Sequence, residues 1–451
     1  MAGEAWRLTL SEGLRRLGEG SLTAQEWVGS LLGRIDACEA WVKAWAHVDR
    51  VGALAAAKRV DDRRATKPRP FPLEGAPIGY KDIIDVAGMP REAGSPLYKG
   101  YAPARDAPVA ARLRAAGAIA LGKTVTTQFA TSDPSVTYNP WNPVHSPGGS
   151  SSGSAAGVAA GMVPAALGSQ TGGSILRPSA FCGVVGFKPT YGRIPRTGVV
   201  AVSWTLDHLG VIARSAEDAA RLLTVMAGPD AGDDTTVDVP VSDFAAASAP
   251  RKPARVCFLK EDFLPRASRE VAEWTERAVA RLRERGVAVE EGRLPVDFDL
   301  LHAAHRVILR VEQAAYHGRM FLENMDAYLP EVRHNISAGL MVPAVHYLRA
   351  LRLRARLARE MGRLLGRCGL VVCPAMVEAP PRREKSTGNA LFQEPLTQSG
   401  LPAITLPLGR GEGNLPIGIQ LGAGRFEEAG LLAAARWCEA ELGWRSEIAP
   451  L

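Results

Sequence analysis

The residues of this 451-residue chain that are best suited to nucleophilic chemistry lie in a Gly- and Ser-rich stretch from Ser146 to Lys188. Within it, Thr171, Gly172, Gly173 and Ser174 form a predicted turn, in which the two glycines free the backbone from side-chain crowding. Successive backbone N–H groups of such a turn can point at one spot, and a developing oxyanion needs such donors. The pattern therefore predicts that Ser174 is a nucleophile at the end of an oxyanion-binding turn.

The base that would activate this serine must come from elsewhere in the chain. A serine hydroxyl is inert until its proton is removed, and the stretch contains no His, Asp or Glu. Lys81 ends the apolar run that begins at Pro77, and burial there would favour the neutral amine, which can accept a proton. Lys81 is therefore the candidate base. A lysine that emerges into solvent beside Asp82 is the alternative interpretation.

A phosphate-binding loop is suggested by residues 117–124, which match the pattern GxxxxGKT letter for letter. In such a loop the residues between the glycines connect a strand to a helix. Here Gly117 ends a predicted helix, and residues 118–121 are apolar enough to be the strand itself. We therefore expect Lys123 to be structural. A noncatalytic nucleotide-binding module, which ATP would stabilise against heat, is the alternative.

A nucleophile elbow of the α/β-hydrolase type is suggested by residues 149–153, with Ser151 as the nucleophile. No strand pattern precedes this segment. The histidines that follow, His302, His305 and His317, lie in a helical pattern instead of a loop after a strand. We expect packed or partly exposed histidines and no metal site. The elbow alternative predicts that Ser151→Ala abolishes activity.

Three segments together resemble the amidase signature family, whose members share a Ser–cis-Ser–Lys triad. They are Gly-Ala-Pro-Ile-Gly-Tyr-Lys81-Asp, Ser-Pro-Gly-Gly-Ser150-Ser-Ser-Gly and Gly-Ser-Gln-Thr-Gly-Gly-Ser174. The resemblance covers most of the chain. It implies that Ser174 is the nucleophile, that Ser150 follows a cis peptide bond and relays the proton, and that Lys81 is the base. It also implies an oxyanion hole made of the backbone N–H groups of residues 171–174.

The resemblance further implies an α/β fold, with a large twisted mixed β-sheet covered by helices on both faces, and no cofactor. The expected activity is hydrolysis of small linear amides through a Ser174 acyl-enzyme, with carbamate (urethane), urea or ester cleavage as side activities. The alternative function is that of an amidotransferase subunit, which acts in a multi-chain complex on transfer RNA.

Gln128, Phe129, Ser151 and Gly149 are the candidate substrate-binding residues. Many family members have Asp four positions before the nucleophile and Arg two positions after it. This chain has Gln170 and Leu176 at these positions, and Arg177 follows one place later. We expect that a neutral arrangement replaces a charged pair beneath the oxyanion turn.

The order of predicted elements favours a single domain over residues 1–451. We expect an N-terminal helical segment at 1–65, a signature core at 75–228, a surface excursion at 230–253, and a C-terminal part of the same sheet at 254–451. Short apolar runs alternate with helical patterns from residue 76 onward, which is typical of a sheet with packed helices.

Composition and charge narrow the expected partners and location. The net charge of +7 is 54 basic minus 47 acidic groups, too dilute to suggest a nucleic acid or an anionic membrane. The six cysteines match no zinc spacing, and free thiols suit a reducing compartment. The first ten residues lack the features of a signal peptide. We therefore expect a cytoplasmic enzyme without nucleic-acid or membrane partners, and a homodimer is compatible with the resemblance.

Overall fold

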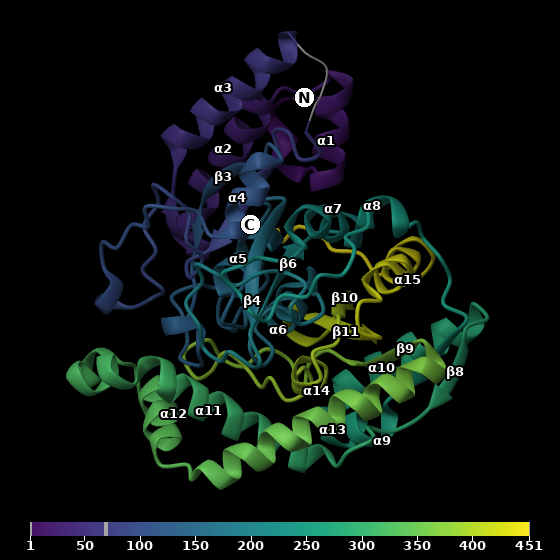
Figure 1. Ribbon diagram of the computed structural model, residues 1–451. Coiled ribbons are helices and arrows are strands. Elements are labelled where there is room, and N and C mark those ends of the chain that lie inside the picture. The colour runs from purple at the N-terminus through teal and green to yellow at the C-terminus, as the bar shows by residue number, and fades with distance from the viewer. Residues whose placement is uncertain (1, 67–70, 451) are drawn as a thin grey trace.

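An 11-stranded mixed sheet runs through the protein (Figure 1). The computed structural model describes residues 2–66 and 71–450. The strand order is β1-β3-β2-β4-β6-β5-β10-β11-β9-β7-β8. Strand β2 is parallel to β3 and β4, and β7 is parallel to β8 and β9, whereas the other pairs are antiparallel. The strands are Trp45–Val48 (β1), Pro77–Lys81 (β2), Ile119–Thr124 (β3), Ala165–Gln170 (β4), Val185–Lys188 (β5), His208–Ala213 (β6), Arg255–Phe258 (β7), Ala288–Glu291 (β8), Leu370–Pro374 (β9), Ala403–Arg410 (β10) and Pro416–Ala423 (β11).

Helices surround this sheet. They are Leu10–Glu19 (α1), Ala24–Val42 (α2), Arg50–Thr66 (α3), Pro108–Ala115 (α4), Ser152–Ala159 (α5), Leu176–Cys182 (α6), Ala216–Met226 (α7), Phe244–Ala247 (α8), Lys260–Phe263 (α9), Arg269–Glu284 (α10), Phe298–Glu323 (α11), Pro330–Leu340 (α12), Ala344–Cys368 (α13), Glu394–Gln398 (α14) and Glu428–Glu441 (α15). Short 3-10 helices occur at Ala2–Arg7 (η1), Pro96–Tyr98 (η2), Gln128–Ala130 (η3), Leu264–Arg266 (η4), Met325–Ala327 (η5) and Glu412–Asn414 (η6).

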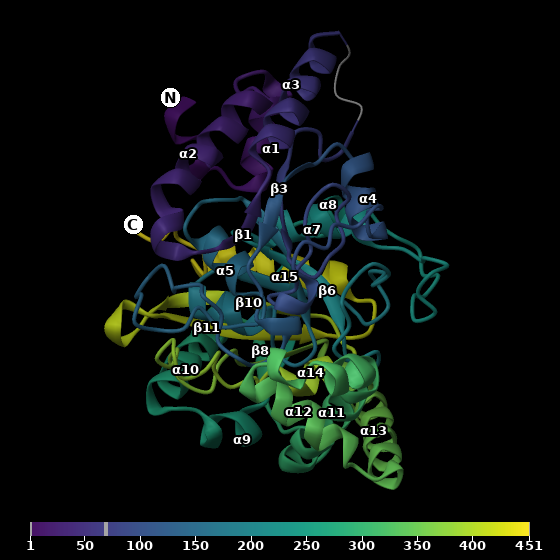
Figure 2. The same ribbon diagram turned by 90° about the vertical axis from the view of Figure 1, so that its left-hand side faces the viewer.

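Two groups of helices lie at opposite ends of the molecule. Helices α1–α3 form one end, and α11–α13 form the other, with the sheet between them (Figures 1 and 2). Around the central strands, α7 and α15 pack against each other and against β6, β10 and β11. The short helices α5 and α6 also pack together and cover the other side of the same strands. The predicted mixed sheet with helices on both faces is confirmed.

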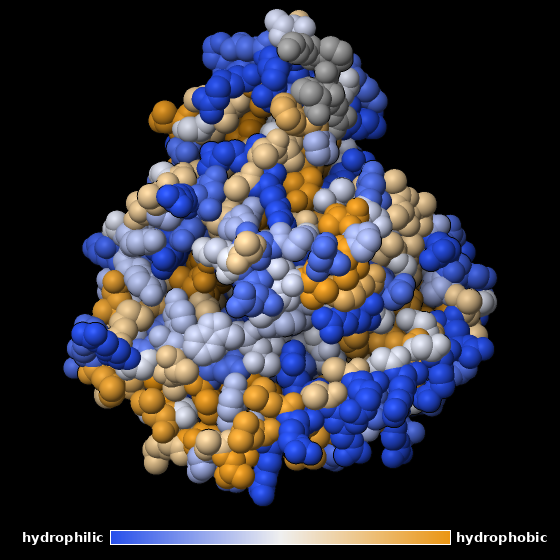
Figure 3. All heavy atoms as spheres, viewed as in Figure 1, coloured by the Kyte–Doolittle hydropathy of each residue, from blue (hydrophilic) through white to orange (hydrophobic). Residues whose placement is uncertain are grey.

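The outer surface of α13 changes character along its length (Figure 3). Where α12 meets α13, apolar side chains gather on the surface, and Leu340, Met341, Val345 and Leu348 are each about half exposed or more. The rest of α13 presents hydrophilic side chains. No helix in the described part of the chain is long and apolar enough to cross a membrane.

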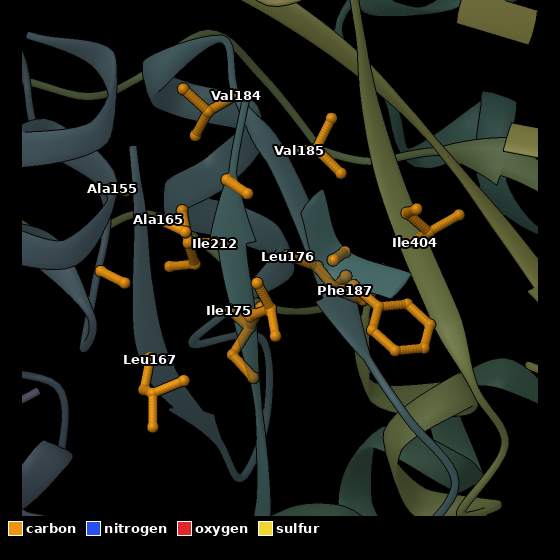
Figure 4. Close-up of a cluster of buried hydrophobic side chains, with 14 of the residues drawn as sticks. Ala155, Ala165, Leu167, Ile175, Leu176, Val184, Val185, Phe187, Ile212 and Ile404 are labelled. Carbon is orange, nitrogen blue, oxygen red and sulfur yellow. The ribbon is translucent and has the colours of Figure 1, made fainter. Parts of the chain in front are cut away.

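Buried apolar side chains fill the space between the central strands and the short helices (Figure 4). Leu167 on β4, Ile212 on β6 and Phe187 on β5 lie in this cluster with Ile175 and Leu176, and all are 0–1% exposed. The last two residues directly follow the candidate nucleophile in the chain. The cluster therefore fixes the backbone that carries Ser174.

The N-terminal 65 residues contain a strand that the sequence pattern missed. Helix α2 ends at Lys43 in the left-handed conformation, with φ of 51°, and the Glu39 carboxylate accepts the N–H groups of Ala44 and Trp45. Strand β1 then pairs with β3. A four-residue edge strand of this kind is formed by tertiary pairing, and hydrophobic periodicity does not reveal it.

Strands from both halves of the chain share the sheet, because β5 pairs with β10 across the intervening sequence. Residues 230–253 run between them with mostly exposed side chains, although α8 buries Phe244. In the C-terminal half, helix α11 ends at Glu323, and the next helix, α12, begins at Pro330. Proline lacks the backbone N–H group that would continue a helix and favours the first helical turn, so the pattern divides there.

Candidate active site

Lys81 lies at the end of β2 with 0% of its surface exposed. Its Nζ is 2.6 Å from Ser150 Oγ and donates to Ser169 Oγ at 2.8 Å. Strands β2 and β4 run parallel with Tyr80 opposite Leu167, which brings Lys81 beside the carboxyl end of β4, where Ser169 lies. The alternative of a solvent-exposed lysine is excluded by this burial.

Ser150 follows a cis peptide bond after Gly149, as the resemblance implies. Arg177 donates through Nη2 to the Gly149 carbonyl oxygen at 2.6 Å and through Nη1 to the Gly388 carbonyl oxygen at 2.6 Å. The preceding Gly148 has φ of 80°, and a Cβ atom there would lie 2.6 Å from the Pro178 Cα. The backbone around Ser150 is therefore held by close packing and by a buried arginine.

Ser174 lies between the end of β4 and the start of α6, and it lines a cavity of about 530 Å³. Thr171, Gly172 and Gly173 line the same cavity. A Cβ atom on Gly173 would lie 2.7 Å from Gln393 Oε1, so a larger residue here would require that side chain to move. Within the described residues, Ser174 Oγ makes no hydrogen bond, in contrast to the bonded Ser150 Oγ.

Gln170 explains one departure from the family pattern. Its Oε1 accepts the N–H groups of Ile175 at 2.8 Å and Leu176 at 2.9 Å, while its Nε2 donates to Thr397 Oγ1 at 2.8 Å. Thr397 Oγ1 in turn donates to the Gly172 carbonyl oxygen at 2.7 Å. The neutral amide thus satisfies two free N–H groups at the start of α6 and links the oxyanion turn to α14. It needs no charged partner, and Arg177 points instead to the Gly149 carbonyl.

Burial lowers the pKa of Lys81 well below its ordinary value of 10.5, because a charged amine loses its hydration there. The carboxylate of Asp207 opposes this shift, and the guanidinium of Arg177 adds to it. Asp207 Oδ1 also accepts a hydrogen bond of 2.6 Å from Thr171 Oγ1, so it contacts the first residue of the oxyanion turn. The arrangement therefore favours a neutral lysine that can accept a proton.

Of the predicted site residues, only those of the turn at 171–174 line this cavity, and Lys81, Ser150 and the four candidate substrate-binding residues do not. Ser151 is fully buried, and its Oγ bonds to the backbone of Ser169 at 3.3 Å. Gln128 bridges the Ala327 carbonyl and the Leu329 N–H, both at 2.7 Å. Phe129 packs against Tyr328, and Gly149 approaches Thr387 so closely that a Cβ atom would lie 2.8 Å from its Cγ2. The structure gives these residues packing contacts.

Lys123, from the apparent phosphate-binding loop, also has a structural environment. A strand was expected at 118–121, and strand β3 covers 119–124. Lys123 Nζ lies 3.3 Å from Asp82 Oδ1 and donates to the Ile84 carbonyl at 2.7 Å. In the described part of the chain, no group of three or more His, Cys, Asp or Glu side chains could hold a metal ion.

Sequence reasoning missed the far wall of the cavity, which α11 supplies. Its lining residues follow helical spacing: His302, His305, Arg306, Leu309, Arg310 and Gln313. His302 Nδ1 lies 2.6 Å from Glu394 Oε2, which raises the pKa of His302, whereas burial lowers the pKa of His305. The i, i+3, i+4 spacing of polar residues was the available signal, but nothing in the sequence pairs this helix face with Ser174.

Comparisons with known proteins cover nearly the whole chain. The family model "Amidase" matches residues 26–432. The chain is 34% identical over 461 residues to a glutamyl-tRNA(Gln) amidotransferase subunit of Chloroflexus aggregans, covering 94% of each chain. It is also similar to a solved structure of a vestigial protein complex that reveals the evolutionary origins of an s-triazine catabolic enzyme. The TM-score is 0.92, and the two chains are 28% identical, with 97% of this chain and 99% of the other covered.

A third similar protein is the peptide amidase of Stenotrophomonas maltophilia, with a TM-score of 0.86 and 29% identity over 98% of this chain and 99% of the other.

These comparisons contradict one prediction. The chain was expected to have no nucleic-acid partner, whereas its curated relatives are named as subunits of an amidotransferase for glutamyl-tRNA(Gln). The prediction was wrong because a dilute net charge argues only against a large basic surface on the chain, and not against membership of an enzyme that acts on a nucleic acid.

Proposed function

Because the chain belongs to the amidase signature family, we propose that it cleaves an amide C–N bond by attack of Ser174 on the carbonyl carbon. The observation that supports this most directly is the 2.6 Å contact between the buried Lys81 Nζ and Ser150 Oγ. A buried amine whose pKa is lowered is a suitable base, and the oxyanion turn beside it offers backbone donors.

The proposed reaction begins with Lys81 neutral, so that the Ser150 hydroxyl donates to the Nζ lone pair. Ser174 Oγ then bonds to the carbonyl carbon and passes its proton to Ser150 Oγ, while the Ser150 proton moves to Lys81. The N–H groups of residues 171–174 bind the oxyanion, and one such donor contributes about 2.7–4 kcal/mol in related chemistry. When the C–N bond breaks, the same path returns the proton to the leaving amine, and water later releases the acyl group.

The curated relatives favour a place for this reaction in a larger enzyme. In this proposal the chain is the amide-cleaving subunit of an amidotransferase, in which it releases ammonia from a small amide and other chains bind the aminoacylated transfer RNA. The similarity extends over 94% of each chain, which supports the same overall construction.

A stand-alone amidase for small molecules is the second candidate, with carbamate, urea or ester cleavage as side activities. The specific observation in its favour is the peptide amidase, which is 29% identical and covers 98% of this chain. Both candidates use the same acyl-enzyme at Ser174, and they differ in whether the isolated chain turns over substrate efficiently.

The test is steady-state ammonia or amine release by the purified chain, using a panel of primary amides, an anilide, a carbamate and an ester. Ser174→Ala and Lys81→Ala should abolish turnover, whereas the exposed controls Ser242→Ala and Lys99→Ala should retain it. Full activity in Lys81→Ala would overturn the proposed mechanism.

The two candidates are separated by adding partners. An amidotransferase subunit should turn over slowly alone and accelerate when the other subunits of such an enzyme and glutamylated transfer RNA are added. Rapid turnover by the isolated chain, without any response to these additions, would favour the stand-alone amidase.

A further inference from the structure

The far wall of the cavity contains two buried polar side chains without partners. Gln313 is 0% exposed and His305 is 2% exposed, and both line the cavity with Ser174. Within the described residues, neither the Gln313 amide nor the His305 ring has a hydrogen-bond partner. A buried polar group left unpaired costs about 1–3 kcal/mol, so such groups call for an explanation.

Both side chains offer the same combination of hydrogen-bonding atoms. The Gln313 amide has a carbonyl acceptor and an NH₂ donor, and a neutral imidazole has one acceptor and one donor. Burial keeps His305 neutral by lowering its pKa. His305 also lies next to the oxyanion turn, because a Cβ atom on Gly172 would be 3.5 Å from its Nε2. A bound group that both donates and accepts would satisfy this wall.

Charge does not decide what the cavity binds. Among the lining residues of the described chain, two acids make no ion pair (Glu331 and Glu378), and neither do four cations (Arg177, Arg306, Arg310 and Lys385). Arg177 is committed to backbone carbonyls, and Glu394 to His302. Apart from Arg177, the excess is one positive charge on exposed or partly exposed side chains. Its effect on binding is weak compared with that of two buried and unpaired polar groups.

We propose that the α11 wall selects substrates whose acyl portion carries a second amide group, which hydrogen bonds to Gln313 and His305. This inference rests on the proposed amide cleavage at Ser174 and adds the substrate class. A second carboxamide or peptide amide supplies the donor and the acceptor that each side chain lacks. An alkyl or aryl acyl group would leave both side chains unpaired, and such mismatches are rejected strongly.

The test compares succinamide with 4-methylpentanamide, which replaces the second carboxamide by an apolar isopropyl group of the same shape, and with succinamate. The wild type should hydrolyse succinamide with a kcat/KM at least tenfold above that of 4-methylpentanamide. Equal turnover of these two amides would overturn the proposal. A tenfold preference for succinamate would overturn it too, because charge would then select the substrate.

Gln313→Met keeps the size of the side chain and should reduce the ratio of kcat/KM for succinamide to kcat/KM for 4-methylpentanamide about tenfold. Gln398→Met is the matched control, because Gln398 is also 0% exposed with an unpaired amide but does not line the cavity. If Gln398→Met changes the preference as much as Gln313→Met, the effect is structural and the proposal fails.

Binding separates this inference from the proposed catalysis. In Ser174→Ala, succinamide should raise the melting temperature more than 4-methylpentanamide does, even if no amide is hydrolysed. Turnover that depends on Ser174 but shows no preference for the second amide would leave the proposed function intact and refute only the α11 assignment. The absence of a binding preference in Ser174→Ala would also refute it.

Discussion

The two walls of the cavity differ in how their polar side chains are satisfied. On the wall that carries Ser174 and directly behind it, Lys81, Gln170 and Arg177 each make at least two hydrogen bonds within the chain, and of these three only Arg177 lines the cavity itself. On the α11 wall, His305 and Gln313 make none among the described residues. The first wall is organised before any ligand arrives, which catalysis requires. The second wall has the character of a site that a ligand completes.

The largest effect should follow from removing the nucleophile on the organised wall. Ser174→Ala should lower kcat by about 10³-fold or more, because members of a catalytic triad act as a unit. The hydroxyl lines the cavity and makes no hydrogen bond within the described chain, so folding should be unchanged. Single-turnover kinetics with intact-mass detection of the acyl-enzyme measure this directly. An acylated Ser174→Ala variant would show that another residue is the nucleophile.

The pH dependence should follow the neutral fraction of Lys81. Because burial lowers the pKa of Lys81, kcat/KM should rise tenfold per pH unit below that lowered pKa and reach a plateau well before pH 10.5. Asp207 and Arg177 are the charged groups that influence this lysine most. A kcat/KM profile that is flat from acidic to alkaline pH, over the range in which the chain stays folded, would argue against a lysine base.

The free energy of unfolding should also depend on pH through the protonation of Lys81. Between the lowered pKa and 10.5, Lys81 is neutral in the folded chain and protonated in the unfolded chain, so unfolding takes up a proton. The free energy of unfolding should therefore rise with pH in this window, by up to about 1.4 kcal/mol per pH unit. Lys81→Met should reduce this slope in denaturant titrations at several pH values. An unchanged slope would mean that Lys81 remains charged when buried.

A smaller effect should follow from the support beneath the oxyanion turn. Gln170→Leu removes the acceptor of two N–H groups at the start of α6, and we expect a 10- to 100-fold loss in kcat with little change in KM. Gln170→Glu keeps the acceptor oxygens and should retain more activity. A loss that appears in KM alone would place Gln170 in substrate binding instead.

The contrast between the walls also explains what the sequence could predict. Ser174 and Lys81 lie in short motifs whose residue types indicate their chemistry, and the alternating pattern indicated a sheet with packed helices. The role of Ser150 and the mixed sheet followed from the resemblance to the family. Gln313 is 139 positions beyond Ser174, on a helix whose polar residues show only helical spacing. Which face of α11 meets the oxyanion turn depends on tertiary packing, which local sequence does not show. Gln128 and Phe129 were predicted from local sequence, and they make packing contacts outside the cavity lining.

The smallest effect is expected on the outer surface of α13, away from both walls. Arg349, Arg352 and Arg356 are exposed and make no ion pair within the described chain. Exposed charges are screened over about 10 Å at ordinary ionic strength. Replacing each of these arginines by Gln should therefore change the kcat/KM for small amides less than twofold. The free energy of unfolding of each variant should change by about 0.5 kcal/mol or less. Parallel amide kinetics and denaturant titrations test this. A tenfold loss of small-amide hydrolysis would mean that α13 controls the position of the α11 wall, and the two sides of the cavity could then no longer be treated as independent.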